Sequence, residues 1–182
     1  SLHDALPILL IALLRELHQT PLDCELWLVA SSSEEVGLRG GQTATRAIHP
    51  DIALVLDTAC WSKNFDYGSA NHRQIGAGPM LVLYDKTLIA PAKLIALADT
   101  IAQSQGIPLQ KDMFSNGGTD GGAIHLSGTG VPTLVLGPPT RHGHCAASIA
   151  DEKDIHHTQQ LLVALVAGMN RETVDHLTDF RC

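Results

Sequence analysis

Carboxylates follow two apolar, strand-like runs of this sequence. Glu34 and Glu35 stand shortly after the run 26–30, and Asp57 stands directly after the run 52–56. Charge is costly to hold at the end of a buried strand, and the carboxyl edge of an α/β sheet is where ligands bind. If the backbone at Glu34 and Glu35 is extended, the two side chains point in different directions. One of them can then bind a metal ion while the other faces a water molecule.

Two histidines could add nitrogen ligands to these oxygens. His142 and His144 follow a third strand-like run, 131–136, after a pair of prolines that can stiffen the loop. Neutral imidazole is the commonest metal ligand in proteins. The spacing leaves open which of the two histidines would bind. Carboxylates and imidazoles delivered to one edge by separate strands predict a metal site.

Each acidic residue also has an ordinary structural interpretation. Glu35 can be a helix-capping acid in a solvated turn, and Asp57 can be a turn or capping residue. The glycine-rich run 117–122 could bind a phosphate on its backbone amides, but it lacks the lysine of a P-loop. We therefore expect Asp120, within this run, to orient a ligand or to shape a pocket. The serines at 31–33 lack the glycine pattern of a nucleophile elbow, which disfavours a serine hydrolase.

The hydrophobic pattern predicts strands that alternate with helices. The expected strands are 25–30, 52–56, 80–84, 109–113 and 131–136, the last of the chain. The expected helices are 8–18, 38–48, 91–103, a brief helix to about 126, and 151–170. This order predicts an α/β three-layer sandwich with helices on both faces of a central mixed, mostly parallel sheet.

The composition is that of an ordinary globular domain. The chain has 182 residues, of which 45% are apolar and 17% are charged. A net charge of -7 with scattered basic residues argues against nucleic acid as a partner. The four cysteines are widely spaced, which is typical of free thiols in a reducing compartment. The apolar segment 5–17 is too short to span a membrane, so we expect a cytoplasmic protein with no membrane partner.

Four blocks of the sequence, taken together in order, resemble one enzyme family. They are EEVGLRG at 34–40, PDIALVLDT at 50–58, GAGP at 76–79, and GGTDGGAIHLSGTGVPTLVLGPPTRHGHC at 117–145. They are similar to the glutamyl/tetrahedral aminopeptidase family of dinuclear metallopeptidases, some members of which are labelled endoglucanases. The resemblance extends from about residue 9 to about residue 166.

The resemblance implies a role for each candidate. Glu34 would be the general base, Glu35 and His144 would be ligands of one divalent metal ion, and Asp57 would be a ligand of a second. The residues expected to support the ligands or shape the pocket are Asp120, Arg141 and His142. Zinc, cobalt and manganese suit mixed carboxylate and imidazole ligands about equally well. The implied activity is a metal-dependent aminopeptidase that removes N-terminal residues from short peptides and forms a homo-oligomer at full length.

Parts of the family pattern are not found in this sequence. These are an earlier histidine ligand, an inserted dimerisation domain, and a bridging aspartate in an Asp-x-Arg motif. Asp4 stands near the place of that motif but has no arginine two residues later, so we do not assign it as the bridge. We therefore expect residues 1–182 to form a single partial catalytic domain, truncated at its N-terminus and inactive alone. It should bind at most one metal ion weakly, and it should expose an apolar patch.

Two alternatives remain. The chain could be a degenerate, non-catalytic fragment that acts at most as an interaction module. A sugar hydrolase with paired carboxylates is disfavoured, because adjacent Glu34 and Glu35 cannot flank one glycosidic bond from opposite sides.

Overall fold

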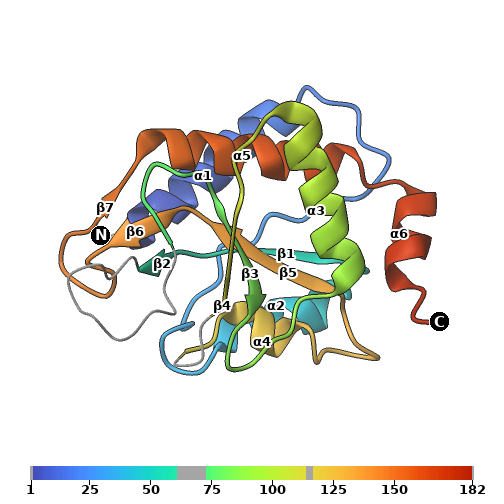
Figure 1. The fold of residues 1–182 in the computed structure, drawn as a ribbon. Coiled ribbons are helices and arrows are strands. Elements are labelled where there is room, and N and C mark those ends of the chain that lie inside the picture. Colours follow the sequence, from blue (N-terminus) through green and yellow to red (C-terminus); the bar gives the residue numbers. More distant parts are fainter. Residues whose placement is uncertain (1, 61–72, 114–116, 182) are drawn as a thin grey trace.

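Strands and helices alternate along the part of the chain that the computed structural model describes, residues 2–60, 73–113 and 117–181 (Figure 1). The helices are α1 (Leu2–Leu17), α2 (Arg39–Ile48), α3 (Ala92–Gln105), α4 (Asp120–Ile124), α5 (Glu152–Ala167) and α6 (Arg171–Thr178). The strands are β1 (Ala53–Leu56), β2 (Ala59–Cys60), β3 (Met80–Tyr84), β4 (Gln110–Met113), β5 (Thr133–Gly137), β6 (Pro139–Arg141) and β7 (Ile149–Ala150). Most of the expected elements are confirmed, with shifts at their ends; α1 begins well before the predicted helix.

The central sheet has four strands in the order β1-β5-β3-β4. The pairs β1–β5 and β3–β4 are parallel, and β3–β5 is antiparallel, so the predicted mixed, mostly parallel sheet is confirmed. Because β1 and β5 run in the same direction, their carboxyl ends meet at one edge of the sheet, on the left in Figure 1. The residues that follow these two strands are therefore brought together.

Helices cover both faces of this sheet. In Figure 1, α1, α3 and α5 lie on one face, and α2 and α4 lie on the other. Side chains alternate along a strand, and two cores form accordingly. Leu81, Leu134 and Leu136 belong to the core under α1, α3 and α5. Val82 and Val135 belong to the smaller core on the opposite face. This arrangement confirms the three-layer sandwich.

A second, three-stranded sheet follows the central one, in the order β2-β6-β7. The prediction that 131–136 is the last strand is therefore wrong. β5 ends at Gly137, and the next residue, Pro138, has no N–H with which to continue the ladder. β6 leaves the central sheet and pairs in parallel with β2 and antiparallel with β7.

The segment 25–30 is not a strand, contrary to the prediction. Its side chains alternate as in an extended chain: Leu26 and Leu28 pack against the core, whereas Trp27 and Val29 are exposed. Its backbone pairs with no strand of the described part of the chain. The apolar pattern predicts such alternation, but it does not supply the hydrogen-bonding partner that makes an extended segment a strand.

Apolar side chains are exposed on one side of α1. Ile8, Ile11 and Leu14 are exposed, each by about half or more of its surface, and share one side of the helix. The opposite side, with Leu13 and Leu17, belongs to the core. Among the described residues, none of the helices combines the length and the apolar character needed to cross a lipid bilayer.

The predicted helix 151–170 is confirmed as α5, and a further helix that was not predicted, α6, follows it. α5 ends at Ala167 and is followed by Gly168, and α6 begins at Arg171. The Asn170 side chain accepts a hydrogen bond from the Thr173 backbone N–H, which caps the start of α6. A capping asparagine therefore begins a new helix where the sequence pattern predicted the end of the first.

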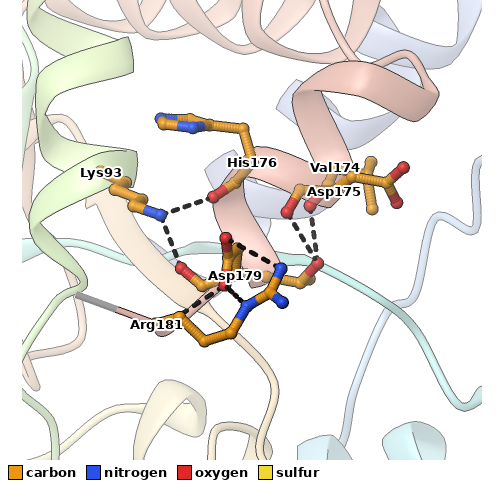
Figure 2. A network of polar contacts seen from close by, with 7 residues as sticks. Lys93, Val174, Asp175, His176, Asp179 and Arg181 are labelled. Carbon is orange, nitrogen blue, oxygen red and sulfur yellow. Dashed lines mark hydrogen bonds and ion pairs between the residues drawn. The ribbon is translucent and has the colours of Figure 1, made fainter.

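One lysine of α3 contributes to holding the last helix, whose Leu177 is part of the core (Figure 2). Lys93 Nζ, from α3, donates to the carbonyl oxygens of His176, at 2.9 Å, and Asp179, at 2.5 Å. The Asp179 carboxylate accepts hydrogen bonds from the backbone N–H and Nε of Arg181. These bonds hold the pKa of Asp179 below its ordinary value. A cation at the carboxyl end of a helix is favourable because it satisfies carbonyl groups that have no partner within the helix.

Asp154 lies in the first turn of α5, and its side chain is fully buried. It accepts hydrogen bonds from the backbone N–H groups of Gly76 and Gly78, both at 2.7 Å. These bonds fix the segment that leads into β3.

Replacing Asp154 with alanine is expected to lower the free energy of unfolding by about 2–4 kcal/mol, because two backbone N–H groups lose a charged acceptor. Urea denaturation measures this change. The matched control is Asp151→Ala, which removes the cap of α5 and should cost about 1 kcal/mol. An Asp154 variant no less stable than this control would contradict the interpretation.

Candidate functional site

The turn that carries Glu34 and Glu35 has an unusual backbone. Ser33 and Leu38 both have positive φ angles, 63° and 56°. The backbone N–H groups of Gly37 and Leu38 donate to the Glu34 carbonyl oxygen at 3.1 and 2.9 Å. Left-handed backbone at residues other than glycine is uncommon and costs on the order of 1 kcal/mol per residue. This backbone conformation lets α2 begin at Arg39, four residues after Glu35.

The loop between β6 and β7 brings a histidine to this turn. His144 Nε2 lies 3.1 Å from Glu35 Oε2. His142 and His144 both have a φ of 59°, and both side chains are exposed. The sequence spacing left the two histidines open, and the contact with Glu35 favours His144. These residues are 109 positions apart in the sequence.

Asp57 lies where β1 ends. Its backbone N–H donates to the Leu136 carbonyl oxygen at 3.1 Å, which extends the β1–β5 ladder by one bond. Its Oδ1 accepts from the Thr58 N–H at 2.6 Å, so the ordinary turn role is also present. Gly137 packs against the Asp57 backbone so closely that a Cβ there would overlap the Asp57 carbonyl oxygen. A glycine at the end of β5 is therefore needed for Asp57 to take this position.

Asp120 is the first residue of α4 and is buried. Ser31 Oγ donates to its Oδ2 at 2.5 Å. Its Oδ1 is buried and accepts no hydrogen bond from the described residues. A buried carboxylate oxygen without a donor is costly. This oxygen therefore has a lone pair available to a hydrogen-bond donor or to a cation.

Burial and neighbouring carboxylates raise the proton affinity of Glu34 and Asp57. Burial raises the pKa of Glu34 to about 7, and the charges of Asp57, Glu35 and Asp120 contribute, while His144 opposes the change. Burial also raises the pKa of Asp57 to about 6, with contributions from Asp120 and Glu35. The Thr58 N–H and His144 act in the opposite direction on Asp57. These couplings bring Glu34, Glu35, Asp57, Asp120 and His144 into one electrostatic cluster.

The remaining candidates lie beside this cluster. Arg141 is the last residue of β6, pairs with Ile149 of β7, and is half-buried. His142 follows it with an exposed side chain. The side chain of Asp4 lies outside the described part of the chain.

The chemistry of the cluster fits a divalent cation. Its donors are carboxylate oxygens and an imidazole nitrogen, and one carboxylate oxygen is buried without a partner. A dication would offset the repulsion that raises the pKa of Glu34 and Asp57. Among the described side chains, no three His, Cys, Asp or Glu residues are arranged to hold a metal ion. Glu35 and His144 are two donors side by side.

Sequence reasoning missed the residues that support Asp120. Ser31 is 89 positions away from it, so no local pattern connects them. Gly40 and Gly41 open α2, although glycine is a poor helix former. A Cβ at Gly41 would lie 2.7 Å from the Asp120 carboxyl carbon, and a Cβ at Gly40 would overlap the backbone of Ser32. Paired glycines in the first turn of a predicted helix were the available signal of close packing.

Comparison with known proteins places this architecture in one family. The family model of the M42 glutamyl aminopeptidases matches residues 7–161. FrvX of Escherichia coli (strain K12), to which aminopeptidase activity is attributed, is 34% identical over 93% of this chain and 49% of its own length. The glutamyl aminopeptidase of Lactococcus lactis subsp. cremoris is 31% identical over 95% of this chain and 48% of its own length.

A solved structure gives the same result in three dimensions. The TET aminopeptidase from a marine sediment archaeon of the Thaumarchaeota superposes with a TM-score of 0.88 at 32% identity. The superposition covers 93% of this chain and 48% of that one. The chain thus spans about half the length of the relatives it matches. Because the family model matches residues 7–161 of the 182, the chain belongs to the M42 glutamyl aminopeptidase family of hydrolases.

Proposed function

We propose that the whole protein is a metal-dependent aminopeptidase that removes N-terminal residues from short peptides. The observation that carries the proposal is the contact of His144 with Glu35, beside Glu34. Two segments far apart in the sequence thereby bring an imidazole to a pair of carboxylates. The names of the relatives, which are aminopeptidases, support the same activity.

The ligand roles follow the resemblance. Glu35 and His144 would hold one divalent ion, and Asp57 would be a ligand of a second. A bound ion supplies a Lewis acid that draws electron density from the peptide carbonyl and makes water more acidic. Asp120 lies close enough to influence both Glu34 and Asp57, and it accepts its hydrogen bond from Ser31. Its role is to hold the carboxylates in place rather than to touch the substrate.

Glu34 is the general base of the proposed reaction. Its carboxylate removes a proton from the attacking water and later delivers that proton to the leaving amine. A base works best when its pKa lies near the working pH, and burial with neighbouring carboxylates raises the pKa of Glu34 to about 7. Glu35 raises this pKa by its charge, and His144 opposes it. The neighbouring side chains thus tune the pKa of the base.

Residues 1–182 are proposed to be one part of the catalytic domain, and self-association of the whole protein is part of the same proposal. The chain spans about half the length of its relatives, so further ligands would come from outside it. The alternative, a non-catalytic interaction module, is an outcome of the experiments below.

Glu34→Gln in the whole protein should lower kcat/KM by about 10²–10⁴-fold, because the amide cannot accept the proton. Metal content, measured by elemental analysis, should stay the same, since both ligand sets remain. The control is Glu152→Gln, at an exposed position in the first turn of α5. A Glu34 variant with wild-type turnover would disprove its role, and no turnover even in the wild type would favour the non-catalytic alternative.

The metal-free chain should become less stable as the pH rises from about 4 to about 8. The folded pKa of Asp57, about 6, and that of Glu34, about 7, exceed the ordinary values of 3.8 and 4.5. The folded state therefore keeps protons that the unfolded chain has released. This stabilisation is complete below the ordinary values and is lost as the pH passes through the raised ones.

Asp57→Asn isolates this effect, since the amide keeps an acceptor for the Thr58 N–H. Relative to wild type, the variant should gain stability on the order of 2 kcal/mol between about pH 4 and pH 7. Chemical denaturation in the presence of a chelator measures the difference at each pH. A difference that does not change with pH would contradict the raised pKa of Asp57.

The 182-residue chain should bind at most one divalent ion, and weakly. Glu35 and His144 offer two ligands and Asp57 offers one, whereas stable zinc sites use three or four protein ligands. Titration calorimetry with zinc should give a stoichiometry of one or less, and His144→Ala should abolish binding. His156→Ala, at an exposed position of α5, is the control. Two tightly bound ions per chain would show that other residues complete both sites.

A further inference from the structure

A buried carboxylate that has no role in the proposed reaction lies directly after β3. Asp85 is fully buried, and its sequence context did not mark it. We infer that Asp85 is a positioning residue for the candidate site, which acts through Thr119 and Asp120 on the turn that carries Glu34 and Glu35. The inference rests on the proposed function for the identity of the site, but the chain of contacts stands without it.

Asp85 joins two loops. Its Oδ1 accepts hydrogen bonds from the Thr87 backbone N–H, at 2.6 Å, and Oγ1, at 2.7 Å. Its Oδ2 accepts from Thr119 Oγ1 at 3.0 Å. The Lys86 N–H donates to the Gly117 carbonyl oxygen at 3.0 Å, which adds a backbone link between the same loops. The loop after β3 therefore holds the glycine-rich loop before α4.

Glycines allow these loops to approach so closely. A Cβ at Gly118 would lie 2.7 Å from Thr87 Oγ1, and a Cβ at Gly122 would overlap that oxygen. The hydroxyl that these glycines accommodate is the one that donates to Asp85. The glycine-rich run 117–122, first considered as a phosphate loop, thus serves close packing against the Asp85 turn.

The same contacts continue to the site. Thr119 precedes Asp120, whose Oδ2 accepts from Ser31 Oγ at 2.5 Å. Ser31 stands three residues before Glu34, and Gly41 packs against the Asp120 carboxyl group from the start of α2. Asp120 is therefore enclosed by the segment before the two glutamates and by the helix after them. A displacement of Thr119 would move Asp120 and release both.

The buried hydroxyl of Thr119 is the link that a substitution can cut selectively. Thr119→Val keeps the shape of the side chain, removes the donor to Asp85, and leaves the Asp85–Thr87 bonds in place. Thr119→Ser restores the hydroxyl. Thr158→Val is the matched control, since Thr158 is also fully buried and loses one hydrogen bond, to the Asp154 carbonyl oxygen within α5.

Amide hydrogen exchange of the metal-free chain tests the inference directly. The reporters are the N–H groups of Gly37 and Leu38, which donate to the Glu34 carbonyl oxygen. Thr119→Val should speed their exchange roughly fivefold, as expected for the loss of one supporting hydrogen bond. Thr119→Ser and Thr158→Val should leave it unchanged. Wild-type exchange at these amides in Thr119→Val would overturn the inference.

Ser31→Ala, at a surface position, provides a second variant that should fold in any case. It removes the hydrogen bond from Ser31 to Asp120, at the other end of the same series of contacts, and should speed exchange at the same two amides. In the double variant with Thr119→Val the two effects should not add, because both act through Asp120. Additive effects would mean that Thr119 acts independently of Ser31 and would overturn the inference.

Zinc affinity separates this inference from the proposed function. Thr119→Val should weaken zinc binding roughly tenfold, as is typical for residues that orient ligands, and Thr158→Val should not. Zinc affinity in Thr119→Val equal to that of wild type would overturn the positioning role. If the wild-type chain binds no zinc, the metal site proposed here fails, and the exchange measurements still decide whether Asp85 positions the turn.

Discussion

The pairing of β5 with strands on both of its sides organises this molecule. All five of its residues are buried, β1 joins it in parallel, and β3 joins it antiparallel. Leu134 and Leu136 form the core with α1, α3 and α5, and Val135 faces the opposite core. At the end of β5, Gly137 lets the Asp57 backbone approach. One strand therefore supports both helical layers and also fixes Asp57, one of the acidic residues of the candidate site.

Side chains of like charge lie together at the edge of the sheet where β1 and β5 end. Glu34, Glu35, Asp57 and Asp120 repel one another, and this repulsion, added to burial, raises the pKa of Glu34 and Asp57. Such an arrangement opposes folding at neutral pH, when no cation is bound. The surrounding structure offsets the cost through the two cores and through close glycine contacts at positions 41 and 137. The fold is therefore less stable at this site than it would be without the charged groups gathered there.

Sequence patterns predicted the layers and most elements, because apolar periodicity reflects burial. They did not predict that 25–30 lacks a strand partner, since pairing depends on distant residues. The residue pattern predicted a site at Glu34, Glu35, Asp57 and one of two histidines. The family resemblance favoured His144, and His144 is the histidine that contacts Glu35. Asp85 gave no signal of its link to the site, because its partner Thr119 comes from another loop and is 34 positions away in the sequence.

The attachment of α6 has an evolutionary consequence. Lys93 is bonded to main-chain carbonyl oxygens, at positions 176 and 179, rather than to particular side chains. Every amino acid offers such an oxygen, so the residues at these two positions can change in descendants of this chain without loss of the acceptors. Lys93 itself is less replaceable, because arginine presents a planar fork in place of a compact ammonium group. Among related sequences, Lys93 should therefore be retained while the residues at positions 176 and 179 diverge.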